Sequence, residues 1–115
     1  MTPTIVLKNN KPWILVGTPG GTTIPTSVYQ TLVDIIDFKM TARESVDFPK
    51  FHHQWLPDEI AVEKNFDKKI LEKLKTMGYK ITLRNSIGRT EVIITDGSTI
   101  TAVADNRGDD GAAGY

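Results

Sequence analysis

A glycine-rich turn after an apolar segment is the feature that most constrains the fold of this chain. The apolar segment 13–16 (WILV) runs into the turn 17–23 (GTPGGTT), and apolar residues recur at helical spacing from Ile24 onward. A strand that continues through such a turn into a helix presents unpaired backbone N–H groups at the helix start, where they attract negative charge. The sequence predicts either a small anion-binding turn or, as the simpler alternative, a tight bend that needs glycine for its backbone angles.

Composition narrows the class of protein. The 115 residues suffice for one domain, residues 1–115, with one modest core, and the 39% hydrophobic and 24% charged residues are typical of a globular protein. The formal net charge of 0 offers no electrostatic basis for binding nucleic acid. Cysteine is absent, which excludes disulfides and thiolate nucleophiles. No targeting signal and no membrane-spanning apolar run is recognisable.

The first half of the chain predicts a hairpin followed by two helices. Strands are expected at 4–8 and 13–17, and both segments are almost continuously apolar, which is typical of strands covered on both faces. Helical spacing covers 24–37. Thr41 and Glu44 form a capping-box pattern for a short second helix that should end before Pro49.

The second half predicts a third helix and further strands. A short strand is expected at 60–62, and a helix with Asp67 as its N-cap should end at Gly78. A strand at 80–84 precedes a hairpin of 91–95 and 99–104, in which the alternating residues Ile100, Ala102 and Ala104 suggest a buried face. Together these segments predict a mixed α/β (α+β) unit with two antiparallel hairpins and about three helices.

Two groups of side chains are of types that bind metal ions, and for both we favour a structural role without metal. His52 and His53 are adjacent, so on an extended segment they point to opposite faces, and no third ligand is evident. Asp105, Asp109 and Asp110 carry hard oxygen ligands, but their spacing does not match a calcium loop. We therefore expect a structured, hydrogen-bonded loop at 51–59 and no metal or cofactor.

The catalytic groups of an acyl-transfer site are only half present. Backbone N–H groups of Gly20 and Gly21 can stabilise a developing oxyanion. An N-terminal nucleophile requires threonine, serine or cysteine at the first position, which Met1 occupies here. None of the serines considered as nucleophiles stands in an elbow-like context: Ser27, Ser45, Ser86 and Ser98.

Four motifs carry a specific resemblance to a known family. They are 1–6 (MTPTIV), 17–21 (GTPGG), 51–58 (FHHQWLPD) and the ending 105–115. In this order and spacing they resemble the C-terminal part of the small subunit of γ-glutamyltranspeptidases, and the resemblance covers essentially the whole chain. It implies part of the αββα sandwich of an N-terminal-nucleophile hydrolase.

The resemblance also implies a reaction and partners. In that family a threonine at the start of the small subunit attacks the γ-glutamyl amide of glutathione or a related compound, and water or an amino-acid or peptide acceptor releases the acyl-enzyme. Gly20 and Gly21 then correspond to the oxyanion hole and contact the substrate. The threonine, two substrate-contacting serines and a large-subunit arginine would lie outside these 115 residues. We therefore expect the large subunit and the rest of the small subunit as partners, and no activity from this chain alone.

Further expectations follow from a partial α/β sandwich. Strands 4–8 and 13–17 should expose apolar surface, so the isolated chain should self-associate. The parent enzyme is expected in the periplasm, secreted or on the cell surface, as is common in the family. Two alternatives stay open: a fragment of a related cephalosporin acylase or amidase, and a standalone binding or assembly module in which the glycine turn is only a bend.

Overall fold

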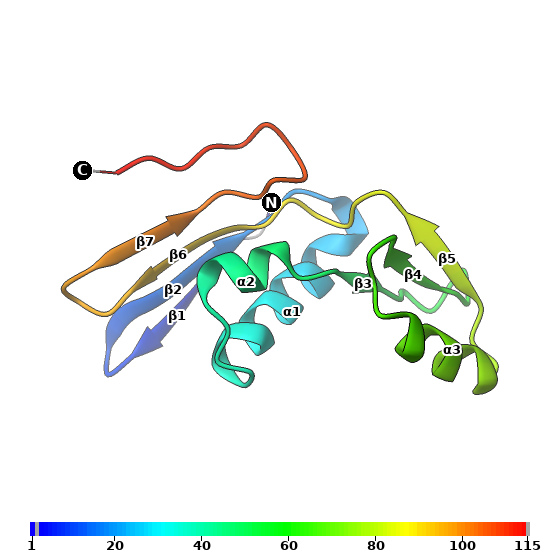
Figure 1. Cartoon of the computed structure of the whole chain (residues 1–115). Coiled ribbons are helices and arrows are strands. Elements are labelled where there is room, and N and C mark those ends of the chain that lie inside the picture. The colour runs from blue at the N-terminus through cyan, green and yellow to red at the C-terminus, as the bar shows by residue number, and fades with distance from the viewer. Residues whose placement is uncertain (2, 115) are drawn as a thin grey trace.

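The computed structural model describes residues 1 and 3–114, which form two β-sheets and three α-helices (Figure 1). The elements are β1 (Thr4–Lys8), β2 (Lys11–Gly17), the 3-10 turn η1 (Gly21–Thr23), α1 (Ile24–Ile36), α2 (Ala42–Asp47), β3 (Phe51–His52), β4 (Ile60–Glu63), α3 (Lys68–Thr76), β5 (Ile81–Arg84), β6 (Glu91–Thr95) and β7 (Ile100–Val103). The predicted fold class, with two antiparallel hairpins and three helices, is confirmed. Within the described part of the chain, no helix has the length and apolar character needed to cross a membrane.

The larger sheet has the strand order β1-β2-β6-β7, and all of its pairs are antiparallel. Helices α1 and α2 lie on one face of it (Figure 1). Val16, Val92 and Val103 stand opposite one another across three strands on that face. They form one core with Ile14 and with apolar residues of the two helices: Val28, Ile35, Ala42 and Val46. Packing of a half-apolar sheet against two amphipathic helices therefore builds the main core.

No helix of the described residues covers the other face of this sheet. The register places Ile5, Leu15, Ile93 and Ala102 in one row across all four strands, on the face away from the helices. Ile5 is 60% exposed, so the apolar residues of β1 and β2 are covered on one face only. The prediction of a buried face is wrong for Ile100 and Ala102, because pairing with β6 turns Val103 toward the core and both of these residues outward. Ala104, which follows the end of β7, is buried as predicted.

Local signals set the boundaries of the first two helices. Proline lies in the first turn of α1, and the helix ends one residue before the predicted boundary. Thr41 caps α2 by accepting a hydrogen bond from the N–H of Glu44, whose carboxylate accepts one from the N–H of Thr41. Phe48, which precedes Pro49, leaves helical geometry as predicted.

The smaller sheet and α3 form a second lobe. Strand β4 pairs antiparallel with β3 and parallel with β5, and α3 connects the two parallel strands. The sequence predicted strands near β4 and β5, but it predicted a loop where β3 lies and did not indicate the parallel pairing. Asp67 caps α3 as expected. Among the apolar residues of α3 and its C-cap, Leu71 and Leu74 are half-buried, whereas Ile70 is 47% exposed and Met77 67%.

Candidate functional site at the glycine turn

The turn at the end of β2 is built by two glycines with positive φ angles. Gly20 has φ 142° and Gly21 has φ 60°, and α1 begins three residues later. A Cβ at Gly20 would collide with the side-chain hydroxyl of Thr23, which donates a hydrogen bond to the Gly20 carbonyl at 3.0 Å. Glycine is therefore needed here for its backbone angles, as the simpler reading of the sequence stated.

The same geometry leaves the backbone N–H groups of the turn available. Both Gly20 and Gly21 are exposed. Among residues 1 and 3–114, neither N–H group donates a hydrogen bond, while the Gly20 carbonyl accepts one from the N–H of Thr23 at 3.2 Å. Unpaired N–H groups at the start of a helix bind anions. The bend and the anion-binding turn predicted as alternatives are thus compatible with each other.

A loop far away in the sequence holds this turn in place. The Thr18 hydroxyl, which is fully buried, donates to the Pro19 carbonyl at 2.7 Å and accepts from the N–H of Arg89 at 2.7 Å. Gly88 approaches so closely that a Cβ there would lie 2.7 Å from Ser27 Oγ. The loop 85–90 therefore fixes the turn from the side, which no pattern in the sequence indicated.

The turn and this loop enclose a shallow cavity of about 370 Å³. Its walls are Pro19, Gly20, Thr23, Arg84, Ser86, Ile87, Gly88 and Arg89. The available backbone donor of Gly20 and two arginine residues thus line one cavity, an arrangement suited to a substrate that carries negative charge or develops it.

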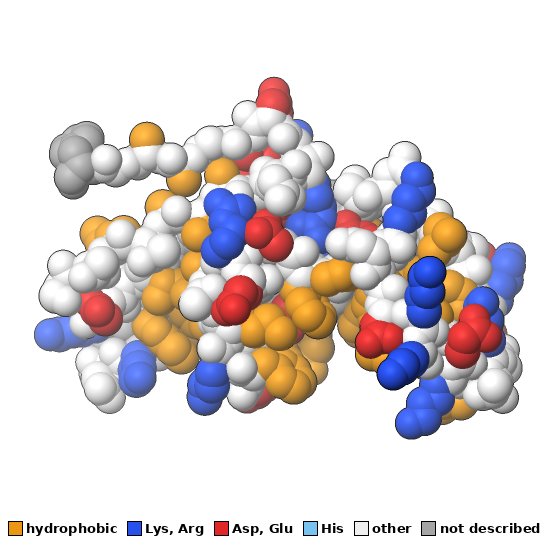
Figure 2. Space-filling view, in the orientation of Figure 1, with side chains coloured by type: hydrophobic (Ala, Val, Ile, Leu, Met, Phe, Trp, Pro, Cys, Tyr) orange, Lys and Arg blue, Asp and Glu red, His pale blue; other side chains and the backbone are white. Residues whose placement is uncertain are grey.

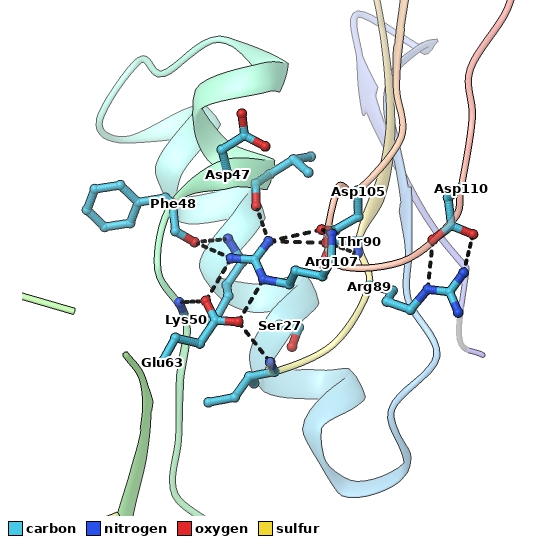
Figure 3. Close-up of polar contacts among 12 residues, drawn as sticks. Ser27, Asp47, Phe48, Lys50, Glu63, Arg89, Thr90, Asp105, Arg107 and Asp110 are labelled. Carbon is cyan, nitrogen blue, oxygen red and sulfur yellow. Dashed lines mark hydrogen bonds and ion pairs between the residues drawn. The ribbon is translucent and has the colours of Figure 1, made fainter. Parts of the chain in front are cut away.

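The C-terminal carboxylates, considered above as cation ligands, pair with arginines instead. Arg89 donates to Asp110 at 2.7 Å and to Asp109 at 3.0 Å, and hydrogen bonds with Asp110 raise the pKa of Arg89. Asp105 pairs with Arg107 at 3.1 Å (Figure 3). Within the described residues no group of three metal-ligating side chains occurs.

A buried ionic cluster surrounds Glu63 and Arg107 (Figure 3). The Glu63 carboxylate accepts four hydrogen bonds: two from the Arg107 guanidinium, both at 2.7 Å, one from the N–H of Lys50 at 2.8 Å and one from the N–H of Ile87 at 2.9 Å. Burial opposes ionisation of Glu63, but these hydrogen bonds outweigh it and hold the pKa of its carboxyl below 4.5.

The cluster joins both lobes and the C-terminal segment. Arg107 also donates to the carbonyls of Val46 at 2.6 Å and Phe48 at 3.1 Å, at the end of α2. The Lys50 ammonium is 1% exposed and donates to the Ser45 carbonyl at 2.6 Å, and burial lowers its pKa. Through the N–H of Ile87, Glu63 also anchors one wall of the cavity. This cluster positions the site, and the sequence alone did not reveal it.

The prediction of a hydrogen-bonded loop at 51–59 is wrong for Phe51 and His52, which pair with β4 as strand β3, whereas the segment from His53 onward is such a loop. His52 is buried, and its ring nitrogens lie 2.8 Å from the Thr26 hydroxyl and 2.9 Å from Gln54 Oε1. His53 lies 3.3 Å from a carboxylate oxygen of Asp58. Because His52 meets the first turn of α1, the loop supports the helix that follows the glycine turn.

The class of protein follows from these parts. A sheet covered by helices on one face, open on the other, and ending at a glycine turn with available N–H groups is part of an N-terminal-nucleophile hydrolase. The family model described as gamma-glutamyltranspeptidase matches residues 1–115. The chain belongs to the γ-glutamyltranspeptidase family, so the resemblance seen in the sequence is confirmed.

Individual relatives support the same family assignment. The glutathione hydrolase proenzyme of Escherichia coli K12 is 43% identical over 117 residues, which cover 100% of this chain and 20% of the relative. A γ-glutamyltranspeptidase structure from Helicobacter pylori is 42% identical with a TM-score of 0.88, over 94% of this chain and 61% of that one. One from Pseudomonas nitroreducens is 30% identical with a TM-score of 0.93, over 100% of this chain and 62% of that one. The chain thus spans about a fifth of the length of its E. coli relative.

Proposed function

We propose that this chain forms the C-terminal part of an enzyme that transfers or hydrolyses the γ-glutamyl group of glutathione and related amides. The observation that carries the proposal is the glycine turn, whose N–H groups at Gly20 and Gly21 are available beside a cavity. The family match across residues 1–115 supports the assignment of these N–H groups as the oxyanion hole. When a nucleophile attacks the amide carbon, negative charge grows on the carbonyl oxygen, and two fixed donors stabilise it without reorganisation.

The other parts of the reaction come from outside these residues in this proposal. The nucleophile is an upstream threonine, the donor is glutathione or another γ-glutamyl compound, and the acceptor is water, an amino acid or a peptide. The partners are the large subunit and the rest of the small subunit. A periplasmic, secreted or cell-surface location of the parent enzyme stays a prediction, which cell fractionation would test.

Activity measurements on the chain alone and on a complete enzyme that contains it test this proposal. We expect the pure 115-residue chain to show no turnover of γ-glutamyl-p-nitroanilide. A chimera in which these residues replace the matching fifth of the E. coli relative should fold, process itself into two subunits and turn over the substrate. Robust turnover by the chain alone would contradict the upstream nucleophile. A folded, processed chimera without turnover would contradict the proposed function.

The two alternatives are less well supported. The family model and the glutathione hydrolase relative favour γ-glutamyl chemistry over a cephalosporin acylase. A standalone module would be expected to cover its own core, whereas here Ile5, Ile93 and Ala102 of the apolar row across the larger sheet are exposed. This open face favours a chain that packs against further polypeptide.

Self-association of the isolated chain belongs to the same proposal. Exposed apolar side chains lie on the outer face of the larger sheet and in an aromatic patch of Tyr29, Phe38, Phe48 and Phe51. Figure 2 shows hydrophobic side chains gathered around the ends of α1 and α2. We expect light scattering to detect oligomers of the pure chain.

A pair of substitutions tests which surface is responsible. Ile100→Lys places a charge on the outer sheet face, where the isoleucine is 73% exposed, and should reduce association. Leu83→Lys, at a leucine that is 64% exposed on β5, serves as the matched control. A strict monomer at high concentration, or equal effects of both substitutions, would contradict an association through this face.

A further inference from the structure

The cavity beside the glycine turn has two walls of different origin. One wall is the turn itself, with Pro19 and Gly20, and the other consists of the end of β5 and the loop toward β6. In Figure 1 this loop passes close to the start of α1. A molecule whose carbonyl oxygen is bound at the turn can therefore extend into the cavity and meet the side chains of the loop.

The two arginines of the cavity differ in whether a carboxylate neutralises their charge. Arg84 and Arg89 line it, and no carboxylate does so among the described residues. Arg89 is neutralised by Asp109 and Asp110. Arg84 is exposed and makes no ion pair or side-chain hydrogen bond within residues 1 and 3–114. One guanidinium fork is thus available in a cavity that already contains a backbone donor, and such a fork matches a carboxylate.

The wall that carries Arg84 is held firmly. The N–H of Ile87 donates to Glu63 at 2.9 Å, and the N–H of Arg89 donates to the Thr18 hydroxyl at 2.7 Å. Gly88 packs against Ser27 and the same threonine. These contacts fix the loop that follows β5 against the glycine turn, and a specificity pocket requires walls fixed in this way.

The geometry points to Arg84 as the residue that binds the carboxylate of the peptide leaving or entering the acyl-enzyme. This inference rests on the proposed function. The γ-glutamyl group carries an ammonium as well as a carboxylate, and no carboxylate among the described lining residues of the cavity offers that ammonium a partner. The cysteinylglycine part of glutathione carries only a carboxylate at its far end while its amide is intact. Two extended residues span about 7 Å, a length suited to a cavity of this size.

The test compares acceptors that differ only in the carboxylate. In the chimera, γ-glutamyl-p-nitroanilide is the donor, because its leaving group has no carboxylate, and glycylglycine and glycylglycinamide are the acceptors. We expect Arg84→Gln to raise the KM for glycylglycine on the order of tenfold, which is the loss of one charged hydrogen bond. The KM for glycylglycinamide, kcat and hydrolysis of the donor should stay unchanged. Arg84→Lys should restore part of the preference for the free dipeptide.

The controls make each outcome decisive. Lys68→Gln removes one exposed positive charge on α3 and should leave both acceptors unaffected. Equal effects of Arg84→Gln on both acceptors, or no effect on either, would overturn the role of Arg84 while the proposed function stands. A folded, processed chimera without turnover of the donor overturns the proposed function and this inference with it.

A binding measurement on the chain itself does not depend on the chimera. In an NMR titration below the concentration at which the chain associates, glycylglycine should shift the signals of Arg84, Ser86 and Gly20, whereas glycylglycinamide should shift them much less. Equal shifts with both peptides, or none with either, would overturn the inference.

Discussion

Glu63 offers the sharpest test of how this chain holds its site together. Its carboxylate is 3% exposed and accepts four hydrogen bonds. In Glu63→Gln the shape is kept, but one oxygen becomes an NH2 group that faces two donors. Each buried donor without a partner costs about 1–3 kcal/mol, and removal of one member of a buried ion pair costs about 3–5 kcal/mol in total. We therefore expect the free energy of unfolding to fall by about 3–4 kcal/mol at pH 7.

Urea unfolding followed by circular dichroism measures this loss. With a slope of about 2 kcal/mol per molar urea, the midpoint should move down by about 1.5–2 M. The matched control is Glu72→Gln, at an exposed pair with Lys75 at 2.8 Å, which should cost less than about 0.5 kcal/mol. A loss below about 1 kcal/mol for Glu63→Gln would refute the reasoning, because a cluster worth so little could not anchor the cavity wall.

The pH dependence provides a second check with a definite sign. The folded pKa of Glu63 lies below its unfolded value of 4.5, so the unfolded chain binds the proton more readily. The carboxylate therefore contributes stability above pH 4.5, and this contribution is lost as the pH falls through the folded pKa. The difference between wild type and Glu63→Gln should shrink toward pH 3, and a constant difference would show that ionisation of Glu63 is not involved.

Three further predictions concern other parts of the chain. In the chimera, Gly20→Ala should lower kcat by about 10²–10³-fold, whereas Gly97→Ala, at a distant turn with φ 94° and open space, should not; equal kinetics would contradict the oxyanion role. Thr41→Ala removes the cap of α2 and should cost about 1 kcal/mol in urea unfolding, and an unchanged midpoint would show that the cap is not stabilising. Hydrogen bonds from the backbone of Thr99 and Ser98 lower the pKa of Asp96 to about 2. An NMR titration should give that midpoint, and because the folded pKa is depressed, the associated stability is present above the unfolded pKa and lost as the pH falls.

Most secondary structure could be predicted because its signals are local. The capping box at Thr41, the N-cap at Asp67 and the Asp96-Gly97-Ser98 turn each act within a few residues, and all are found where the sequence indicated them. The exposed face of β7 was predicted wrongly. Alternation along a strand shows that two faces exist, but only the register with its neighbour decides which face meets the helices.

The turn at Gly20 and Gly21 was predicted from the sequence, whereas the contacts around it depend on the fold. The glycine turn and the family could be recognised from the sequence alone, because glycine requirements and ordered motifs are properties of the chain itself. Tertiary structure decided the rest. Glu63 and Arg107 are 44 positions apart and Thr18 and Arg89 71 positions apart, and only folding brings these buried polar groups within hydrogen-bonding distance. Buried polar groups need partners, and the fold supplies them from distant segments. The loop that fixes the glycine turn, and the position of Arg84 in the cavity wall, could therefore be seen only in three dimensions.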